Sequence, residues 1–219
     1  MASPLFIVGL GGHARVVLAL ARSAGFEVAG FVDMHFDAEG AAQNAEVCGV
    51  RVIGGLAALQ RLGNPAVALA IGNNHDRLRT AASIRAALPG VEFPVLVHAT
   101  AKIEADATIG EGSQICIGAI VCARASIGPF VIINSGSIVD HEDVIEEGSH
   151  ISPGARLAGR VRVGRCTHVG IGATVIEKVT IGSDSIIGGG AVVLRDVPAN
   201  TTAVGVPVRH LPRTPASHG

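Results

Sequence analysis

A six-residue repeat of aliphatic side chains runs through the second half of this chain. Every sixth residue from Val97 to Val193 is Ile, Val or Leu, at 17 consecutive positions. The residue four places after each of these is Ala, Ser, Thr or Val, with the single exception of Asp143. Such a repeat is typical of a parallel β-helix, in which three six-residue rungs make one triangular coil and the coils stack. The sequence therefore predicts an all-β helix over residues 96–219.

Composition agrees with a narrow β-helix and limits the possible partners. Aromatic residues make up only 3% of the chain, with no Trp or Tyr, as suits an interior that excludes rings. The formal net charge is −1 and the basic residues form no run, so neither nucleic acid nor an anionic membrane is expected as a partner. The four cysteines lack metal-type spacing, and no apolar stretch reaches the roughly 18 residues of a membrane span. We expect a cytoplasmic protein with reduced thiols.

Residues 1–95 follow a different pattern, in which apolar strands alternate with helices. Strands are expected at 5–8, 27–33, 50–53 and 66–71, and helices at 14–24, 56–62 and 75–88. This order predicts a small Rossmann-like parallel sheet that binds ligands at the carboxyl ends of its strands. Residues 34–47 are expected to form a loop, and the tail from Pro198 to close the open end of the β-helix and then fray.

A glycine-rich turn, Gly9-Leu10-Gly11-Gly12-His13, follows the first expected strand and opens the first helix. Glycines let a backbone approach a phosphate, and the first N–H groups of a helix attract anions. With Asp33 at the end of the next strand, Gly11, Gly12 and His13 form a candidate nucleotide site, although the glycines would equally suit a tight turn. Ala14 replaces the third glycine of a dinucleotide motif, so a mononucleotide or nucleotide sugar fits this small domain better than NAD.

A second loop at the same sheet edge, Gly72-Asn73-Asn74, follows the strand at 66–71. Gly72 and Asn73 are candidates for contacts to a sugar or a base, because Asn amides both donate and accept hydrogen bonds. A simple helix cap at Asn73 or Asn74 is the alternative.

The middle of the repeat carries Asn134 and the stretch Asp140-His141-Glu142-Asp143. An imidazole beside carboxylates suits a general base, because an acidic neighbour raises its basicity and fixes its tautomer. His141 is expected near a corner of the β-helix; a solvated acidic corner with an incidental histidine is the alternative. Asp143 stands where other rungs have a small interior residue, and a buried unpaired carboxylate is costly, so we expect it to have a partner.

Two pairs of features recur at the 18-residue spacing of adjacent coils. His150 and His168 are expected to stack, and with His141 they could form a three-histidine metal site, although single histidines that donate hydrogen bonds are the simpler reading. Gly170-Ile171-Gly172 and Gly188-Gly189-Gly190 would leave a groove with exposed backbone amides for a thin pantetheine arm, or would simply serve β-helix corners.

These stretches resemble those of the left-handed β-helix acyltransferases, and more closely the bacterial nucleotide-sugar acetyltransferases of the NeuD and PglD type. The shared residues are 8–13, 70–74, 134–142, 150–155, 187–191 and 204–207, spread over almost the whole chain. The resemblance implies a left-handed β-helix, a homotrimer with active sites between neighbouring prisms, and acetyl-CoA as co-substrate without a metal. The chain departs from the family at Val208, where Ala is usual, and at Asp143, where a small residue is usual.

The resemblance also implies roles for individual residues. His141 is the general base and Glu142 orients it, although Asp143 leaves open which carboxylate does so. His150 and the backbone at Ile171, Gly172, Gly189 and Gly190 would contact acetyl-CoA. The nucleotide sugar would be bound by Gly11, Gly12, His13, Asp33, Gly72, Asn73 and Asn134.

The activity implied by the resemblance is transfer of acetyl from acetyl-CoA to the 4-amino group of a nucleotide-linked amino-deoxy sugar, GDP-perosamine being the expected substrate and O-antigen lipopolysaccharide the destination. His141 would accept the amine proton, and the oxyanion would be stabilised by a backbone N–H or by His150. The competing hypotheses are a UDP-linked 4-amino sugar as substrate, O-acetylation of a sialic acid, a β-helical metal hydratase, and a non-catalytic nucleotide-sugar sensor.

Overall fold

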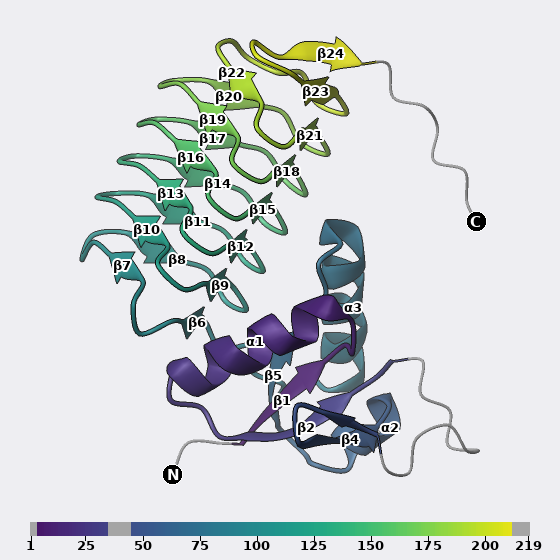
Figure 1. Ribbon diagram of the computed structural model, residues 1–219. Coiled ribbons are helices and arrows are strands. Elements are labelled where there is room, and N and C mark those ends of the chain that lie inside the picture. Colours follow the sequence, from purple (N-terminus) through teal and green to yellow (C-terminus); the bar gives the residue numbers. More distant parts are fainter. Residues whose placement is uncertain (1–3, 35–44, 212–219) are drawn as a thin grey trace. The chain divides into compact units, whose positions relative to one another are not determined.

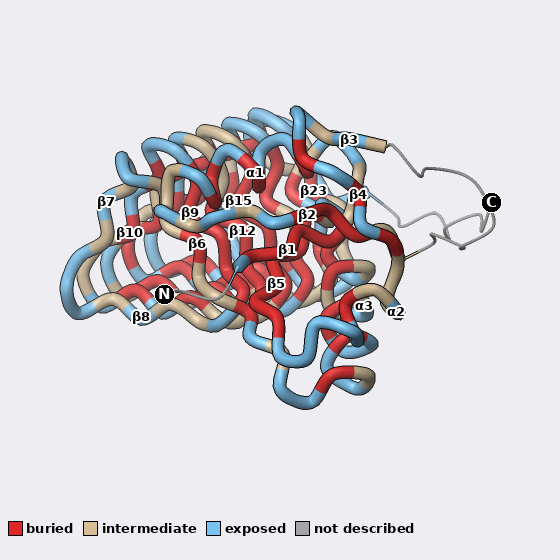
Figure 2. Tube along the Cα trace, turned by 90° about the horizontal axis from the view of Figure 1, so that it is seen from below, coloured by how far each residue is buried: buried red, intermediate tan, exposed pale blue. Residues whose placement is uncertain are grey.

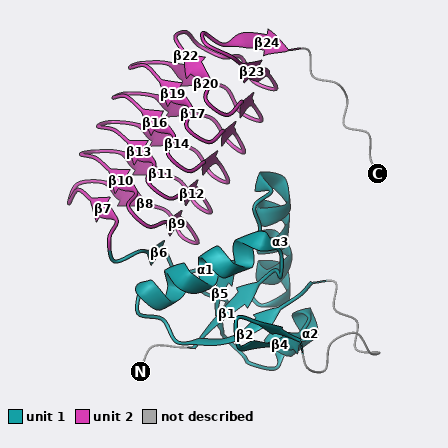
Figure 3. Cartoon of the chain, in the orientation of Figure 1, with its two compact units in different colours: residues 1–99 teal, residues 100–219 magenta. Residues whose placement is uncertain are grey.

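The chain forms two compact units, residues 1–99 and residues 100–219 (Figure 1, Figure 3). The computed structural model describes residues 4–34 and 45–211. The first unit is an α/β sheet and the second a parallel β-helix, which confirms the predicted fold class. No helix in the described part of the chain is long and apolar enough to cross a lipid bilayer.

The first unit is a five-stranded sheet with helices between its strands. Its strands are ordered β3-β4-β2-β1-β5 and, apart from the edge strand β3, are parallel. The inner strand β1 is buried along its whole length, as expected in a parallel sheet, and so is β5 at the edge of the sheet. The elements are β1 (Leu5–Val8), α1 (Gly12–Ser23), β2 (Val28–Val32), β3 (Glu46–Val47), β4 (Val50–Gly54), α2 (Leu56–Gln60), β5 (Ala66–Leu69) and α3 (Asn74–Ala87).

The strand β3 lies in the segment that we expected to be a loop, and that expectation is wrong for Glu46 and Val47. They pair antiparallel with β4 across a two-residue turn at Cys48 and Gly49, which both have positive φ, 50° and 77°. This is the backbone geometry of a tight β-hairpin, and a two-residue strand carries almost no periodic signal in sequence. The rest of the expected loop, residues 35–44, lies outside the described residues.

The second unit repeats a two-residue strand and a turn every six residues. Its strands stack into three parallel sheets, β22-β19-β16-β13-β10-β7, β20-β17-β14-β11-β8, and a third that within this unit runs β24-β23-β21-β18-β15-β12-β9. Residues 18 apart pair, as Val121 and Val139 do. After β6 (Leu96–Val97), the strands are β7 (Lys102–Ile103), β8 (Thr108–Ile109), β9 (Gln114–Ile115), β10 (Ile120–Val121), β11 (Ser126–Ile127), β12 (Ile132–Ile133), β13 (Ile138–Val139), β14 (Val144–Ile145), β15 (His150–Ile151), β16 (Arg156–Leu157), β17 (Arg162–Val163), β18 (His168–Val169), β19 (Thr174–Val175), β20 (Thr180–Ile181), β21 (Ile186–Ile187), β22 (Val192–Val193), β23 (Thr202–Val204) and β24 (Arg209–Leu211).

The interior of the β-helix is filled by the repeat residues, and buried segments recur in every coil (Figure 2). Three of its polar members form hydrogen bonds with the neighbouring coil. The hydroxyls of Ser149, Thr167 and Ser185 each donate to a backbone carbonyl of the next coil at 2.8–2.9 Å and accept a backbone N–H at 3.3 Å. Buried polar groups cost little when they are hydrogen-bonded, so Ser and Thr serve as small interior residues here.

The tail closes the β-helix with a hairpin. The strand β23 continues the third sheet in parallel with β21, and β24 folds back antiparallel on β23. The expected closure of the open end is therefore confirmed for residues up to 211, and the expected fraying lies outside the described residues.

Candidate functional site

The first candidate site is a cavity at the carboxyl edge of the small sheet. The strand order changes direction between β1 and β5, and such switch points are where parallel α/β sheets bind ligands. The cavity measures about 360 Å³ and is lined from three strand ends and one helix. Its lining residues are Val8 at the end of β1, Gly9, Leu10 and Gly11 after β1, Asp33 and Met34 after β2, Ala70, Ile71 and Gly72 after β5, and Asp76 and Thr80 on α3. The structure thus brings together Gly11, Asp33 and Gly72.

The turn after β1 depends on Gly9. Its φ is 108°, and a Cβ at this position would lie 2.9 Å from the Ala70 carbonyl oxygen, so the close approach of the two loops requires glycine. Gly11 then precedes α1 as its N-cap, with Gly12 and His13 in the first turn. Gly12 and His13 are not among the described residues that line the cavity.

On the second loop, Asn73 has the capping role that we considered as the alternative. Its side-chain oxygen accepts the N–H of Asp76 at 3.0 Å and caps α3. The loop is held from below by Arg77, which is fully buried and donates to the carbonyls of Ile71 at 2.9 Å and Gly72 at 3.2 Å. Sequence reasoning missed Arg77, because an arginine in a helix indicates an exposed position unless the tertiary contacts are known.

A second candidate site, on the β-helix, is the turn between β13 and β14, where His141 is exposed at a corner as predicted. The carboxylate that touches the imidazole is that of Asp140, with Oδ1 3.0 Å from Nδ1. The backbone N–H of His141 donates to the same oxygen at 2.6 Å. This bond, followed by that of the side chain, lowers the pKa of Asp140. Asp140 is therefore an ionised partner that lies against Nδ1 of His141.

Glu142, expected to orient His141, is engaged elsewhere. Its carboxylate bridges Arg124 on the coil below, at 3.3 Å, and Arg160 on the coil above, at 3.1 Å. Glu142 has positive φ, 60°, so its side chain leaves the turn in a different direction from that of His141. The structure favours Asp140 over Glu142 as the orienting residue. The 18-residue spacing of 124, 142 and 160 was a sequence signal for this ladder.

Asp143 does not contact the imidazole either, and it has the partners that we expected. It points inside the β-helix with no exposed surface, and accepts the N–H of Asp140 at 2.9 Å and of Val161 at 2.7 Å. Burial raises its pKa to about 7, partly offset by these two hydrogen bonds. Asp143 is thus an internal brace for the turn that carries His141.

Asn134 and His150 lie at a different place in the coil from His141. The oxygen of Asn134 accepts the N–H of Ser135 at 2.8 Å, which leaves its amide nitrogen to donate to Nε2 of His150 at 2.9 Å. His150 belongs to the third sheet, whereas His141 lies at the turn between the first two. Nine residues are one and a half rungs, so the two histidines cannot share a face.

For the same reason, the three histidines do not meet as a metal site within the described part of one chain. His150 and His168 do stack, with ring centroids 5.0 Å apart and an edge-to-face angle of 82°. His168 is also 3.2 Å from the Ser152 hydroxyl. In the described part of the chain, however, His141, His150 and His168 do not form a group whose ligand atoms lie within 4.8 Å of one another.

The turn between the third and first sheets carries the exposed residues Ile171 and Gly189, one coil apart. The N–H groups of Gly172 and Gly190 donate to carbonyls of the coil below, at 2.9 and 2.8 Å. Those of Ile171 and Gly189 have no acceptor among the described residues. Two outward backbone donors about 4.8 Å apart can bind the amide carbonyls of an extended ligand.

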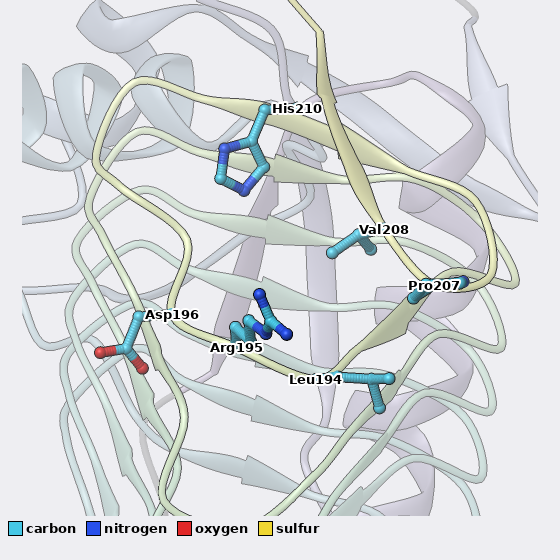
Figure 4. Close-up of a pocket in the computed structure, with 6 residues that line it drawn as sticks. All are labelled: Leu194, Arg195, Asp196, Pro207, Val208 and His210. Atoms are coloured by element: carbon cyan, nitrogen blue, oxygen red, sulfur yellow. The ribbon is translucent and has the colours of Figure 1, made fainter.

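A larger cavity of about 540 Å³ lies at the C-terminal end of the β-helix (Figure 4). It is lined by Leu194, Arg195, Asp196, Pro207, Val208 and His210. Arg195 occupies the same turn position as His141 but lies three coils further along the β-helix. At the spacing of stacked strands, the two positions are about 14 Å apart. The cavity does not include His141, and we assign it no part in the chemistry.

Comparison with known proteins identifies relatives of both units. Residues 4–84 match the family model of the PglD N-terminal domain. A GDP-perosamine N-acetyltransferase from Caulobacter crescentus, solved with CoA and GDP-perosamine, is 35% identical, with 97% of this chain and 99% of that chain covered and a TM-score of 0.88. Two of its structures are of variants in which one histidine is replaced.

Two further relatives match along almost the whole chain. The acetyltransferase domain of PglB from Neisseria gonorrhoeae is 33% identical, with 96% of this chain and all of that chain covered and a TM-score of 0.84. WeeI from Acinetobacter baumannii is 26% identical over 96% of this chain and all of that chain, with a TM-score of 0.82. On these matches, the chain belongs to the NeuD/PglD-type hexapeptide-repeat acetyltransferases.

Proposed function

We propose that this protein transfers the acetyl group of acetyl-CoA to the amino group of a nucleotide-linked 4-amino-deoxy sugar, with GDP-perosamine as the first candidate. The observation that carries the proposal is the match along both units to an enzyme whose structures hold CoA and GDP-perosamine. The chain offers what the reaction needs: a sheet-edge cavity for a nucleotide, outward N–H groups for pantetheine, and an exposed imidazole on an ionised carboxylate.

In the proposed reaction, His141 is the general base. The neutral amine attacks the thioester carbonyl carbon, and as the N–C bond forms the amine proton passes to Nε2 of His141. The tetrahedral intermediate then collapses, the C–S bond breaks, and the proton moves from His141 to the CoA sulfur. Asp140 keeps Nε2 available by holding Nδ1. No residue of the protein is acylated, and the chain needs no metal for these steps.

We also propose that the working unit is a homotrimer in the cytoplasm, where acetyl-CoA and nucleotide sugars are present. The support for a trimer is the division of the site between two turns of the coil, which one chain cannot bring together. A prism with three faces closes readily into a cyclic trimer, in which the His141 turn of one chain meets the Ile171 turn of the next. The acetylated sugar would then serve surface polysaccharide such as O-antigen.

The test is release of free CoA thiol with a panel of GDP-, UDP- and dTDP-linked 4-amino sugars. We expect the highest kcat/KM with GDP-perosamine. Preference for a UDP-linked sugar would overturn the GDP assignment alone. Activity only on sialic acid would replace the substrate class, and no thiol release with any acceptor would favour the non-catalytic sensor.

The role of His141 is tested by His141→Asn. Loss of a general base should lower kcat by about 10²- to 10⁴-fold. The KM values for both substrates and the thermal midpoint should change little, because the side chain is exposed. A kcat within a few-fold of the wild-type value would remove His141 from the mechanism.

A further inference from the structure

The imidazole of His141 lies directly against the backbone of the next coil, at Gly159. A Cβ built on Gly159 would be 2.7 Å from Nδ1 of His141 and still closer to Cε1 and Nε2. Real Cβ atoms do not approach other atoms so closely, so any side chain at position 159 must displace the ring.

The backbone at this position does not itself require glycine. Gly159 does not have a positive φ; the left-handed residue of the turn is Arg160, with φ 65°. The same turn position carries Ala105, Ala123, Glu177 and Arg195 in other coils. Among all the turn positions six residues apart from 105 to 195, glycine occurs only at 159 and 189. Each of these two stands one coil above a predicted site residue, His141 and Ile171.

The backbone of Gly159 is also held in place, so it cannot move aside. The N–H of Arg160 donates to the His141 carbonyl at 2.9 Å, and the Gly159 carbonyl accepts the N–H of Lys178 at 3.1 Å. The ring, by contrast, is about half exposed and can swing outward. A methyl group at position 159 would therefore move the imidazole and break its 3.0 Å contact with Asp140.

We propose that Gly159 is a positioning residue for the reaction. Because it has no side chain, the imidazole of His141 can pack directly against its backbone and is aligned there. This inference rests on the proposed function of His141. A base displaced by about 1 Å costs on the order of 10²-fold in rate. Gly159→Ala should lower kcat by roughly 10- to 100-fold. The KM for acetyl-CoA, the KM for the nucleotide sugar and the thermal midpoint should stay near the wild-type values, because the turn accepts alanine elsewhere.

A double-variant experiment separates this role from a structural one. Gly159→Ala is measured in the wild-type protein and in the His141→Ala protein, where the ring is gone and the methyl group has room. We expect a loss of kcat in the first background and none in the second. Glu177→Ala, at the same turn position one coil above Gly159, is the matched control and should keep kcat within about twofold.

Each outcome has a defined meaning. If Gly159→Ala lowers the thermal midpoint and the double variant His141→Ala/Gly159→Ala does not, the stability data by themselves confirm that the methyl group clashes with the ring. If Gly159→Ala keeps full kcat while His141→Asn is inactive, the positioning role is overturned and the proposed function stands. An equal loss in both backgrounds also overturns it. If His141→Asn remains active, the proposed function fails, and this inference fails with it.

Discussion

Three acidic residues flank His141 in the sequence, and each has a different role in the structure. Asp140 touches the imidazole, Glu142 bridges two arginines, and Asp143 braces the turn from inside the β-helix. Because backbone direction alternates through a tight turn, adjacent residues project to different sides. Three neighbouring carboxylates of similar chemistry therefore have three different sets of contacts.

The first residue-level prediction compares Asp140→Asn with Glu142→Gln. Asp140→Asn replaces the charged partner of Nδ1 and should lower kcat by about 10-fold or more, because the tautomer and basicity of His141 are no longer supported. Glu142→Gln removes only exposed ion pairs, which are worth less than about 1 kcal/mol, and should leave kcat within about threefold. Steady-state kinetics at saturating acetyl-CoA would show this. A larger loss for Glu142→Gln would restore Glu142 as the orienting carboxylate.

The second residue-level prediction concerns Asp143 and pH. Its pKa is raised from 3.8 to about 7 in the fold, mainly by burial. Between about pH 4 and 7 the folded protein therefore binds a proton that the unfolded chain has released, so the stabilising contribution of this group is lost as pH rises through that range. Asp143→Asn cannot titrate. The wild-type thermal midpoint should therefore fall relative to that of Asp143→Asn as the pH rises from 5 to 8.

Thermal melts of Ser137→Ala, at the equivalent interior position of the preceding rung, provide the control, because neither serine nor alanine titrates between pH 5 and pH 8. A constant difference between wild type and Asp143→Asn would show that Asp143 does not titrate in this window.

At the scale of elements, the parallel sheet gathers three loops that are far apart in sequence. Gly11, Asp33 and Gly72 meet because β1, β2 and β5 end at one edge. Asp33→Ala should raise the KM for the nucleotide sugar by roughly 10-fold, the equivalent of one lost hydrogen bond of about 1.5 kcal/mol, and leave the KM for acetyl-CoA unchanged.

Glu27→Ala, just before the opposite end of β2, is the control for Asp33→Ala and should change neither constant. Equal rises in both KM values, or no rise in either, would mean that the first unit does not bind the acceptor. O-acetylation of a sugar without a nucleotide would then become the better hypothesis.

At the scale of the whole molecule, the division of the site predicts an assembly. Light scattering should give three times the 22.1 kDa chain mass. Co-expression of His141→Asn with Gly189→Val should restore about a quarter of wild-type activity, because one interface in four would pair an intact His141 turn with an intact Gly189 turn. A monomeric mass, or no restoration from two individually inactive variants, would contradict a site shared between chains.

The β-helix was predictable from sequence because burial in each rung is a local, strictly periodic requirement, and the 17 aliphatic positions meet it one coil after another. The strand-helix alternation and the turn at Gly9 likewise predicted a sheet-edge site, since parallel strands end at a common edge.

The tertiary structure decided the rest. It showed which acidic residue holds the imidazole, that Arg77 supports the Gly72 loop from within, and that His141 and His150 lie on different faces. It also placed Gly159 against the ring of His141. These are contacts between side chains whose direction depends on turn geometry or on a neighbouring coil 18 residues away, and no local pattern of residue types encodes that direction.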